Sequence, residues 1–262
     1  MNEIESNKHA WGQLSQDHYA HFKKGLLDGS HKLNKHIQGE LGDLSGKKII
    51  HLQCNTGADT ILLAKMGESA VGVDLVPDNI KYAKKLAEDL GIGNVSFIES
   101  DIMDFMGNEK YDVVFVSEGA IGWLPDLNKW GKTIKHLLKE DGYLYVFEGH
   151  PIYLMFDENK LAEGITTIKY PYFKKTPDVD YSIGGYASDT KHDVKTYFWM
   201  NKVSDIINAL TSAGLHIEYF NEFQENFYDS GGCKNLGNGL FNYDFNNGLF
   251  PMSFSLKATV YR

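Results

Sequence analysis

Short apolar runs alternate with amphipathic stretches over most of the chain after Lys47. The apolar runs are continuous, which is typical of strands buried on both faces of a parallel sheet. The stretches between them repeat apolar residues at helical spacing, and one has Pro77 near its start and Gly91 just past its end, as helices often do. The pattern predicts five strands, at residues 48–53, 70–74, 95–100, 111–119 and 143–149.

Helices are predicted at residues 58–66, 77–92 and 127–140, between the strands. The third of these should lead into the fifth strand through a turn at Asp141 and Gly142. A further helix at 203–214 is followed by strands at 215–220 and 253–262. Strands separated by helices indicate βαβ units, so we expect an α/β fold with a mainly parallel sheet and helices on both faces.

Two segments, about 150–200 and 221–251, break this rhythm and are rich in Phe, Tyr and Trp. We interpret them as cap insertions in a domain that spans 46–262. Their aromatic residues could enclose a small apolar or aromatic ligand, or form the insertion's own core. Residues 1–45 are polar with scattered aromatics and read as a helical lead-in.

Composition narrows the functional classes. The chain has 262 residues, 42% of them hydrophobic and 23% charged, which suits one large globular domain. A formal net charge of −9 disfavours nucleic acid as a partner. Cys54 and Cys233 are far apart, with no metal-ligand spacing and no disulfide framework. No signal peptide and no apolar run of about 18 residues is visible, so we expect a cytoplasmic protein without a membrane segment or metal.

Polar residues or glycine occur at three successive strand ends, where ligands of open α/β sheets bind. Gly57 closes the turn after the first strand, and the helix that follows points free N–H groups into the crevice. Asp74, after the second strand, could accept hydrogen bonds from ribose hydroxyls. Asp101, after the third, could accept one from an adenine amino group. Each alone could equally be a turn or a helix cap, but the three together indicate a nucleotide-like ligand.

This succession resembles the class I S-adenosylmethionine-dependent methyltransferases over about residues 45–150, and residues 200–262 fit the end of that fold. The resemblance implies a Rossmann-like sheet of seven strands whose last strand, within "SFSLKATVYR", is antiparallel. It implies S-adenosyl-L-methionine as cofactor and S-adenosyl-L-homocysteine as product. We expect the acceptor to be a small molecule, with its reactive atom and the oligomeric state left open.

The resemblance also implies a set of cofactor contacts. The turn after the first strand would lie along the methionine part, and Asp74 would hold the ribose. Asp101 and Ile102 would contact the adenine, and residues 117–119 would lie near the sulfonium. Tyr19 could close over the donor from the N-terminal side, although helix packing explains it as well. The expected cofactor-binding residues are Tyr19, His51, Gln53, Cys54, Asn55, Thr56, Gly57, Asp74, Leu75, Asp101, Ile102, Ser117, Glu118 and Gly119.

The turn departs from the family pattern of acid-x-Gly-x-Gly-x-Gly. Here it reads "HLQCNTG", so His51 replaces the acid and the first two glycines become Gln53 and Asn55. Asn tolerates left-handed backbone better than most residues, so Asn55 can partly replace a glycine. Gln53 and His51 could reach the amino-acid end of the donor.

Methyl transfer from a sulfonium needs alignment and a deprotonated acceptor more than acid–base catalysis. His150 after the fifth strand and Glu118 are the candidate catalytic residues, with Glu148 as an alternative. His150 could instead bind backbone structurally, either Glu could orient a loop, and His192 reads as a solvated loop residue.

Two other functions remain possible from the sequence. A dinucleotide-dependent oxidoreductase would require a three-glycine turn to cradle a pyrophosphate, which this chain lacks. A protein that binds S-adenosylmethionine without turnover is compatible with the altered turn.

Overall fold

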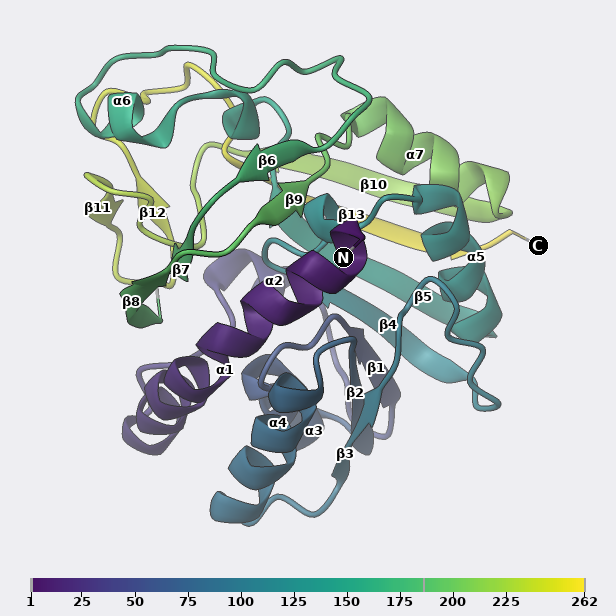
Figure 1. The fold of residues 1–262 in the computed structure, drawn as a ribbon. Coiled ribbons are helices and arrows are strands. Elements are labelled where there is room, and N and C mark those ends of the chain that lie inside the picture. The colour runs from purple at the N-terminus through teal and green to yellow at the C-terminus, as the bar shows by residue number, and fades with distance from the viewer. Residues whose placement is uncertain (1, 186, 262) are drawn as a thin grey trace.

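A seven-stranded sheet forms the centre of the computed structural model, which describes residues 2–185 and 187–261 (Figure 1). The strand order is β3-β2-β1-β4-β5-β13-β10, and β13 runs antiparallel to both of its neighbours. The expected fold, with its antiparallel last strand, is confirmed. The strands are β1 (Lys48–Leu52), β2 (Ser69–Asp74), β3 (Val95–Glu99), β4 (Tyr111–Ser117), β5 (Leu138–Gly149), β10 (Leu215–Phe223) and β13 (Ser253–Val260).

Successive residues of the central strands enter different hydrophobic clusters. On β4, Val113 and Phe115 pack against α2 and α3, whereas Val114 and Val116 pack against α5 and α7. This alternation follows from the two-residue repeat of a strand and explains why the runs are apolar throughout. The helices are α1 (Glu3–Asp28), α2 (Lys35–Glu40), α3 (Ala58–Met66), α4 (Pro77–Asp89), α5 (Leu127–Leu137) and α7 (Val203–Ser212).

The strand order reverses between β1 and β4. The chain runs outward from β1 through β2 to β3, and then returns to place β4 on the other side of β1. The carboxyl ends of β1 and β4 therefore flank a crevice, which is where open α/β sheets bind ligands.

The junction between α5 and β5 differs from the prediction. The helix ends at Leu137 and the strand begins at Leu138, so Asp141 and Gly142 lie inside β5 rather than in a turn. The pairing of β5 with β4 shifts register between Tyr111 and Val113. A Cβ on Gly142 would lie 2.8 Å from the carbonyl oxygen of Tyr111, so this irregular stretch of strand requires glycine.

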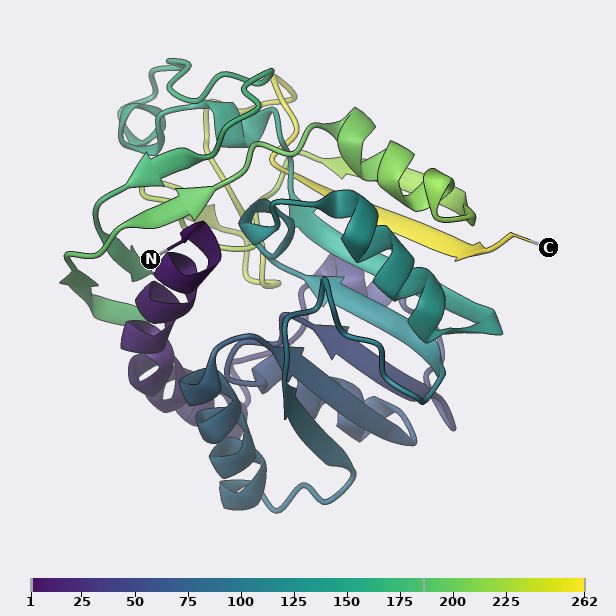
Figure 2. The same cartoon turned by 45° about the vertical axis from the view of Figure 1, so that its right-hand side comes forward.

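The aromatic segments form a separate layer above the carboxyl ends of the strands (Figure 2). A cluster centred on Tyr153, Leu161, Tyr243 and Met252 gives this cap a core of its own. The cap elements are η2 (Tyr153–Met155), α6 (Glu158–Ala162), β6 (Asp178–Asp180), β7 (Ile183–Gly185), β8 (Ser188–His192), β9 (Thr196–Phe198), β11 (Lys234–Asn235) and β12 (Phe241–Asn242).

Helix α1 lies between the cap and the sheet domain (Figure 1). Near its start, Asn7 exchanges two hydrogen bonds with the backbone of Tyr197 on β9, at 2.7 and 2.8 Å. About two turns further on, Ser15 donates to Oδ1 of Asn79 on α4 at 2.6 Å. The N-terminal helix is thus attached to both halves of the molecule.

Candidate active site

The turn between β1 and α3 keeps left-handed backbone without most of its usual glycines. The φ angles are 57° at Gln53, 51° at Asn55 and 78° at Gly57. Left-handed backbone strains residues that carry a Cβ, and Asn is among those that tolerate it. Gly57 cannot be replaced in the same way, because its Cβ would lie 2.5 Å from the ring of Phe97. The expectation that Asn55 takes over a glycine conformation is met, and Gln53 does the same.

Asp74 at the end of β2 holds this turn in place. Its Oδ2 accepts a hydrogen bond from the backbone N–H of Asn55 at 2.8 Å. Its Oδ1 accepts from the N–H of Val76 at 2.9 Å and from Asn79 at 3.2 Å. Burial raises the pKa of Asp74 to about 6. Asp74 lines the pocket, and a carboxylate can accept about four hydrogen bonds, one more than these three.

His51, in place of the family's acid, is a buried neutral side chain. Its Nδ1 lies 2.9 Å from Oγ1 of Thr60, and its Nε2 lies 3.4 Å from Oγ of Ser117. Burial lowers the pKa of His51 to about 4, so the ring is uncharged near neutral pH. The imidazole therefore joins β1, α3 and β4 but supplies no charge to a ligand.

Three carboxylates gather where β4 and β5 end. Glu148 accepts hydrogen bonds from the backbone N–H groups of Gly119, Ala120 and Ile121 at 2.9, 2.6 and 3.3 Å, and so shapes the loop after β4. Burial raises its pKa to about 7. Asp59 pairs with His31 at 2.9 Å. The third is Glu118.

Glu118 has a left-handed backbone, with a φ of 54°. Its Oε1 accepts a 2.8 Å hydrogen bond from Nδ2 of Asn34. Burial, with Asp59 and Glu148 adding like charge, raises the pKa of Glu118 well above its usual value. A non-glycine residue strained in this way, at the mouth of a crevice, points to a functional position.

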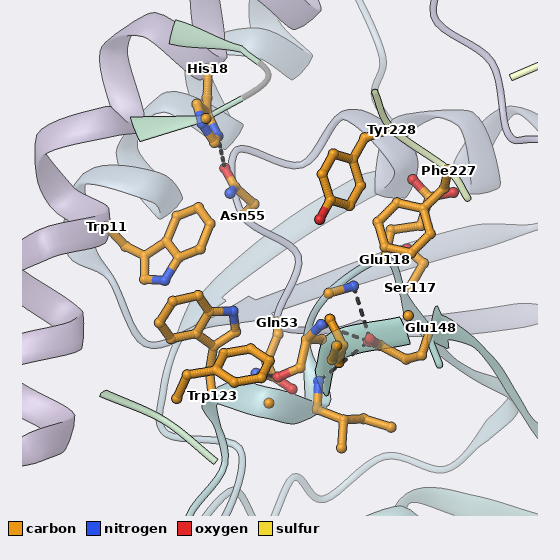
Figure 3. Close-up of a pocket in the computed structure, with 18 of the residues that line it drawn as sticks. Trp11, His18, Gln53, Asn55, Ser117, Glu118, Trp123, Glu148, Phe227 and Tyr228 are labelled. Atoms are coloured by element: carbon orange, nitrogen blue, oxygen red, sulfur yellow. Dashed lines mark hydrogen bonds between the residues drawn. The ribbon is translucent and has the colours of Figure 1, made fainter. Parts of the chain in front are cut away.

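These residues line one large pocket with a volume of about 1220 Å³. Trp11 and Trp123 lie on one side of it and Phe227 and Tyr228 on the other, with Gln53 between them (Figure 3). Pockets for one small ligand usually measure about 300–1000 Å³, so this one is larger than a single small ligand usually requires. The expected residues that line it are His51, Gln53, Cys54, Asn55, Thr56, Asp74, Leu75, Asp101, Ile102, Ser117, Glu118 and Gly119.

Aromatic rings from three separate segments close one side of the pocket. The ring centroid of Trp123 lies 5.2 Å from that of Trp11 on α1 and 5.3 Å from that of Phe198 on β9. Both pairs meet edge to face. A Cβ on Gly122 would fall 1.9 Å from the ring of Phe198, so glycine is what lets β9 approach η1 (Ile121–Trp123). Trp123 could not be predicted from the sequence, because its neighbours come from distant segments.

Two of the expected cofactor-binding residues, Gly57 and Tyr19, do not line the pocket. Gly57 is covered by Phe97. Tyr19 lies where α1 contacts α4, with its hydroxyl hydrogen-bonded to Asp89 and its ring packed at a tilt of 31° against Tyr82. The expectation that Tyr19 contacts the donor is therefore wrong, because this side chain fills the α1–α4 contact instead.

His150 is the second correction. Its side chain is fully buried, with Nδ1 accepting from the N–H of Ile152 at 3.1 Å and Nε2 lying 2.9 Å from Glu222 on β10. The ring packs edge-on against Phe254 rather than facing the crevice. His150 therefore ties β5 to its neighbours, as the structural interpretation predicted. His192, expected in a loop, lies in strand β8.

A family model for a methyltransferase domain matches residues 43–176. The chain belongs to this family. It is 31% identical over 116 residues to a ubiquinone biosynthesis O-methyltransferase of Actinobacillus pleuropneumoniae, covering 42% of this chain and 49% of that one. It is 30% identical over 104 residues to an uncharacterized RNA methyltransferase of Clostridium acetobutylicum, covering 39% and 23%. The chain thus spans about half, or less, of the length of these curated relatives.

A solved structure shares the fold over nearly its whole length. The putative S-adenosylmethionine-dependent methyltransferase of Listeria monocytogenes superposes with a TM-score of 0.61 at 18% identity, over 87% of this chain and 97% of that one. The expected class I S-adenosylmethionine-dependent methyltransferase is confirmed at the level of family and fold. Among the residues that the structure describes, no helix is long and apolar enough to span a membrane, and no group of His, Cys, Asp or Glu side chains could hold a metal ion.

The residues present suit an S-adenosylmethionine molecule. In the described part of the chain, Oε1 of Gln53 and Oγ1 of Thr56 are buried in the turn without a hydrogen-bond partner. Such atoms are costly unless a ligand or water satisfies them. Asp74 offers an acceptor for ribose hydroxyls, and helix α3 begins immediately after the turn, where its free N–H groups favour a carboxylate.

Proposed function

We propose that this chain transfers a methyl group from S-adenosylmethionine to a small-molecule acceptor. The observation that carries the proposal is the large pocket beneath the cap at the β1–β4 switch point, which is lined by polar groups suited to the donor and is larger than one small ligand usually requires. In this proposal residues 46–262 are the methyltransferase domain, with caps at about 150–200 and 221–251. Residues 1–45 cover the site.

The donor would lie along the strand ends in the order that the family resemblance implies. Asp74 would accept from the ribose hydroxyls, and Asp101 and Ile102 would contact the adenine beside Leu75. The turn from Gln53 to Thr56 would follow the methionine part. Ser117 to Gly119 would lie near the sulfonium.

The acceptor would lie beneath the aromatic cap. Phe227 and Tyr228 face the interior of the pocket opposite Trp11 and Trp123, which suits a compact ligand with apolar surface (Figure 3). RNA is a poorer match, because the chain carries a net charge of −9 and phosphate groups favour basic surfaces. The pocket lining is itself acidic and includes Asp59, Asp74, Asp101, Glu118, Glu148, Glu158, Asp178, Asp180 and Asp229.

S-adenosylmethionine supplies a methyl group that is already activated on a sulfonium. The chain's own residues then need only hold the two ligands in line and exclude water. Helix α1 and the cap provide the cover, and Glu148 fixes the loop after β4 through three backbone N–H groups. His150 takes no part, because its nitrogens are engaged away from the pocket.

Calorimetry with S-adenosylmethionine and S-adenosylhomocysteine tests the donor assignment. We expect micromolar binding of both, weakened at least tenfold by Asp74→Ala, as for loss of a charged hydrogen bond. Absence of binding at high micromolar ligand would contradict the cofactor assignment.

A methyl-transfer assay tests the acceptor class. Phenols, amines, thiols, carboxylates and a structured RNA should be offered in parallel to the same preparation. We expect turnover with a small molecule. Turnover with RNA alone would replace the proposed substrate class, and donor binding without any turnover would favour the non-catalytic alternative.

A further inference from the structure

The charge that this family places at the end of β1 is missing here, although the proposed donor still carries an α-ammonium group. His51 occupies that place, and both ring nitrogens already have partners in Thr60 and Ser117. The pocket therefore needs a carboxylate from elsewhere if the ammonium group is to be bound with charge complementarity.

The register of the sheet shows where such a group can come from. His51 pairs with Phe115, and just beyond the ends of the two strands Nε2 of Gln53 donates to the carbonyl oxygen of Ala120 at 2.8 Å. Glu118 lies in the same loop after β4, and its side chain lines the same pocket. A carboxylate that follows β4 therefore lies across the crevice from the turn that would hold the methionine part.

Of the three carboxylates at this end of the sheet, Glu118 is the one left for a ligand. Asp59 is paired with His31 at 2.9 Å, and Glu148 accepts from three backbone N–H groups. Glu118 accepts a hydrogen bond from the neutral amide of Asn34, at 2.8 Å. A buried carboxylate without a cation is a costly arrangement, which an arriving ammonium group would relieve.

Asn34 is itself built into the fold as a positioning residue. Its Oδ1 caps helix α2 by accepting from the N–H groups of His36 and Ile37 at 2.9 and 3.1 Å. This leaves its Nδ2 free to donate to Glu118. The side chain is 2% exposed, so its rotamer is held by packing on both sides.

We propose that Glu118, oriented by Asn34, binds the α-ammonium group of the donor and replaces the acidic residue that the family carries at the position of His51. This inference rests on the proposed function. It assigns Glu118 to donor recognition, so the residue selects for ligands that carry the amino-acid part.

The test compares two ligands that differ in that part. S-adenosylhomocysteine has the α-amino acid, whereas 5′-deoxy-5′-methylthioadenosine keeps the adenosine and the sulfur without it. In Glu118→Gln we expect S-adenosylhomocysteine to bind roughly 10- to 100-fold more weakly and methylthioadenosine to bind as before. Asp101→Asn is the matched control, because a change on the adenine side should weaken both ligands by the same factor.

A second pair of variants separates orientation from folding. Asn34→Ser keeps an oxygen that can cap α2 but removes the donor to Glu118, whereas Asn34→Ala removes both. We expect each variant to reduce the preference for S-adenosylhomocysteine over methylthioadenosine, and Asn34→Ala alone to lower thermal stability clearly. A preference unchanged in Asn34→Ser would overturn the positioning role.

Proton release gives an independent readout. Groups that act on Glu118 are Asp59 on α3, Glu148 and Tyr145 on β5, and the amide of Asn34. Because burial and like charge raise the pKa of Glu118, an arriving ammonium group should displace a proton. Calorimetry in buffers of different ionisation enthalpy should show proton release with S-adenosylhomocysteine that is absent with methylthioadenosine and in Glu118→Gln.

The outcomes are distinguishable. If the unchanged protein binds neither ligand, the proposed function fails and the inference fails with it. If it binds both ligands and Glu118→Gln leaves their affinity ratio and the proton release unchanged, the donor assignment stands and the role of Glu118 is overturned.

Discussion

The backbone N–H of Asn55 donates a 2.8 Å hydrogen bond to Oδ2 of Asp74. This bond joins the turn after β1 to the end of β2, so the two places expected to hold the methionine part and the ribose are parts of one structure. The same carboxylate reaches α1 through Asn79 and Ser15. Changes at Asp74 should therefore act on stability as well as on ligand binding.

The raised pKa of Asp74 predicts a pH dependence of folding. Its folded-state pKa is about 6, against an ordinary value of 3.8. Between these values the folded protein retains a proton that the unfolded chain loses, so this group makes the free energy of unfolding fall as pH rises. The difference of about two pKa units corresponds to about 3 kcal/mol as an upper limit. Urea unfolding at pH 4.5, 5.5 and 6.5 would measure it.

Asp74→Asn is the control for that measurement. Buried Glu148 and Glu118 also have raised pKa values, and they remain in both proteins. The difference between the two pH slopes therefore isolates Asp74. Parallel slopes would show that its folded-state pKa is not raised.

The left-handed turn predicts that two small substitutions of Asn55 differ in their effect on stability. Asn55→Gly should remove the strain of a φ of 51° but lose the hydrogen bond that Oδ1 of Asn55 accepts from the N–H of Thr56 at 2.6 Å. Asn55→Ala should be less stable than Asn55→Gly by about 1–2 kcal/mol, since alanine is disfavoured in that region and both variants lose the same side chain. The free energy of unfolding in urea would decide, and equal stability of the two variants would mean that the turn relaxes to another conformation.

Gly122 predicts a specific steric conflict between η1 and the cap. Gly122→Ala would place a Cβ 1.9 Å from the ring of Phe198, and overpacking of this kind costs about 1–3 kcal/mol. In a Phe198→Ala background the ring is gone, so the added methyl should cost much less. A double-mutant cycle by urea unfolding measures this coupling, and additive effects would contradict the contact.

Restoring the family's acid should harm this protein. His51→Asp would put a buried carboxylate near Asp59 and remove the ring that joins Thr60 to Ser117. We expect a loss of about 2–4 kcal/mol of stability, in the range for an unpaired buried charge. His51→Asn is the neutral comparison in thermal unfolding, and it should be the more stable of the two. Equal or greater stability of His51→Asp would show that position 51 accommodates a buried charge without cost.

Much of the sheet could be predicted from the sequence because buried parallel strands are continuous apolar runs, and glycine and polar residues mark their ends. Asp74 and Asp101 were found for that reason. What could not be predicted depends on packing between distant segments. Asn34 meets Glu118 from 84 positions away. His150 follows a strand as a ligand-binding residue can, yet the position of Glu222 turns it into a structural link.

Part of the cap packs on its own side chains, around Tyr153, Leu161, Tyr243 and Met252, whereas Leu240 and Phe227 join a cluster that holds the sheet. Mutations near the first group should therefore disturb the donor-binding half less than mutations at Leu240 or Phe227. Such a division favours the evolution of new acceptor preferences, since the roof can diversify while the floor stays the same. It also makes the cap the natural region to randomise in a directed-evolution library.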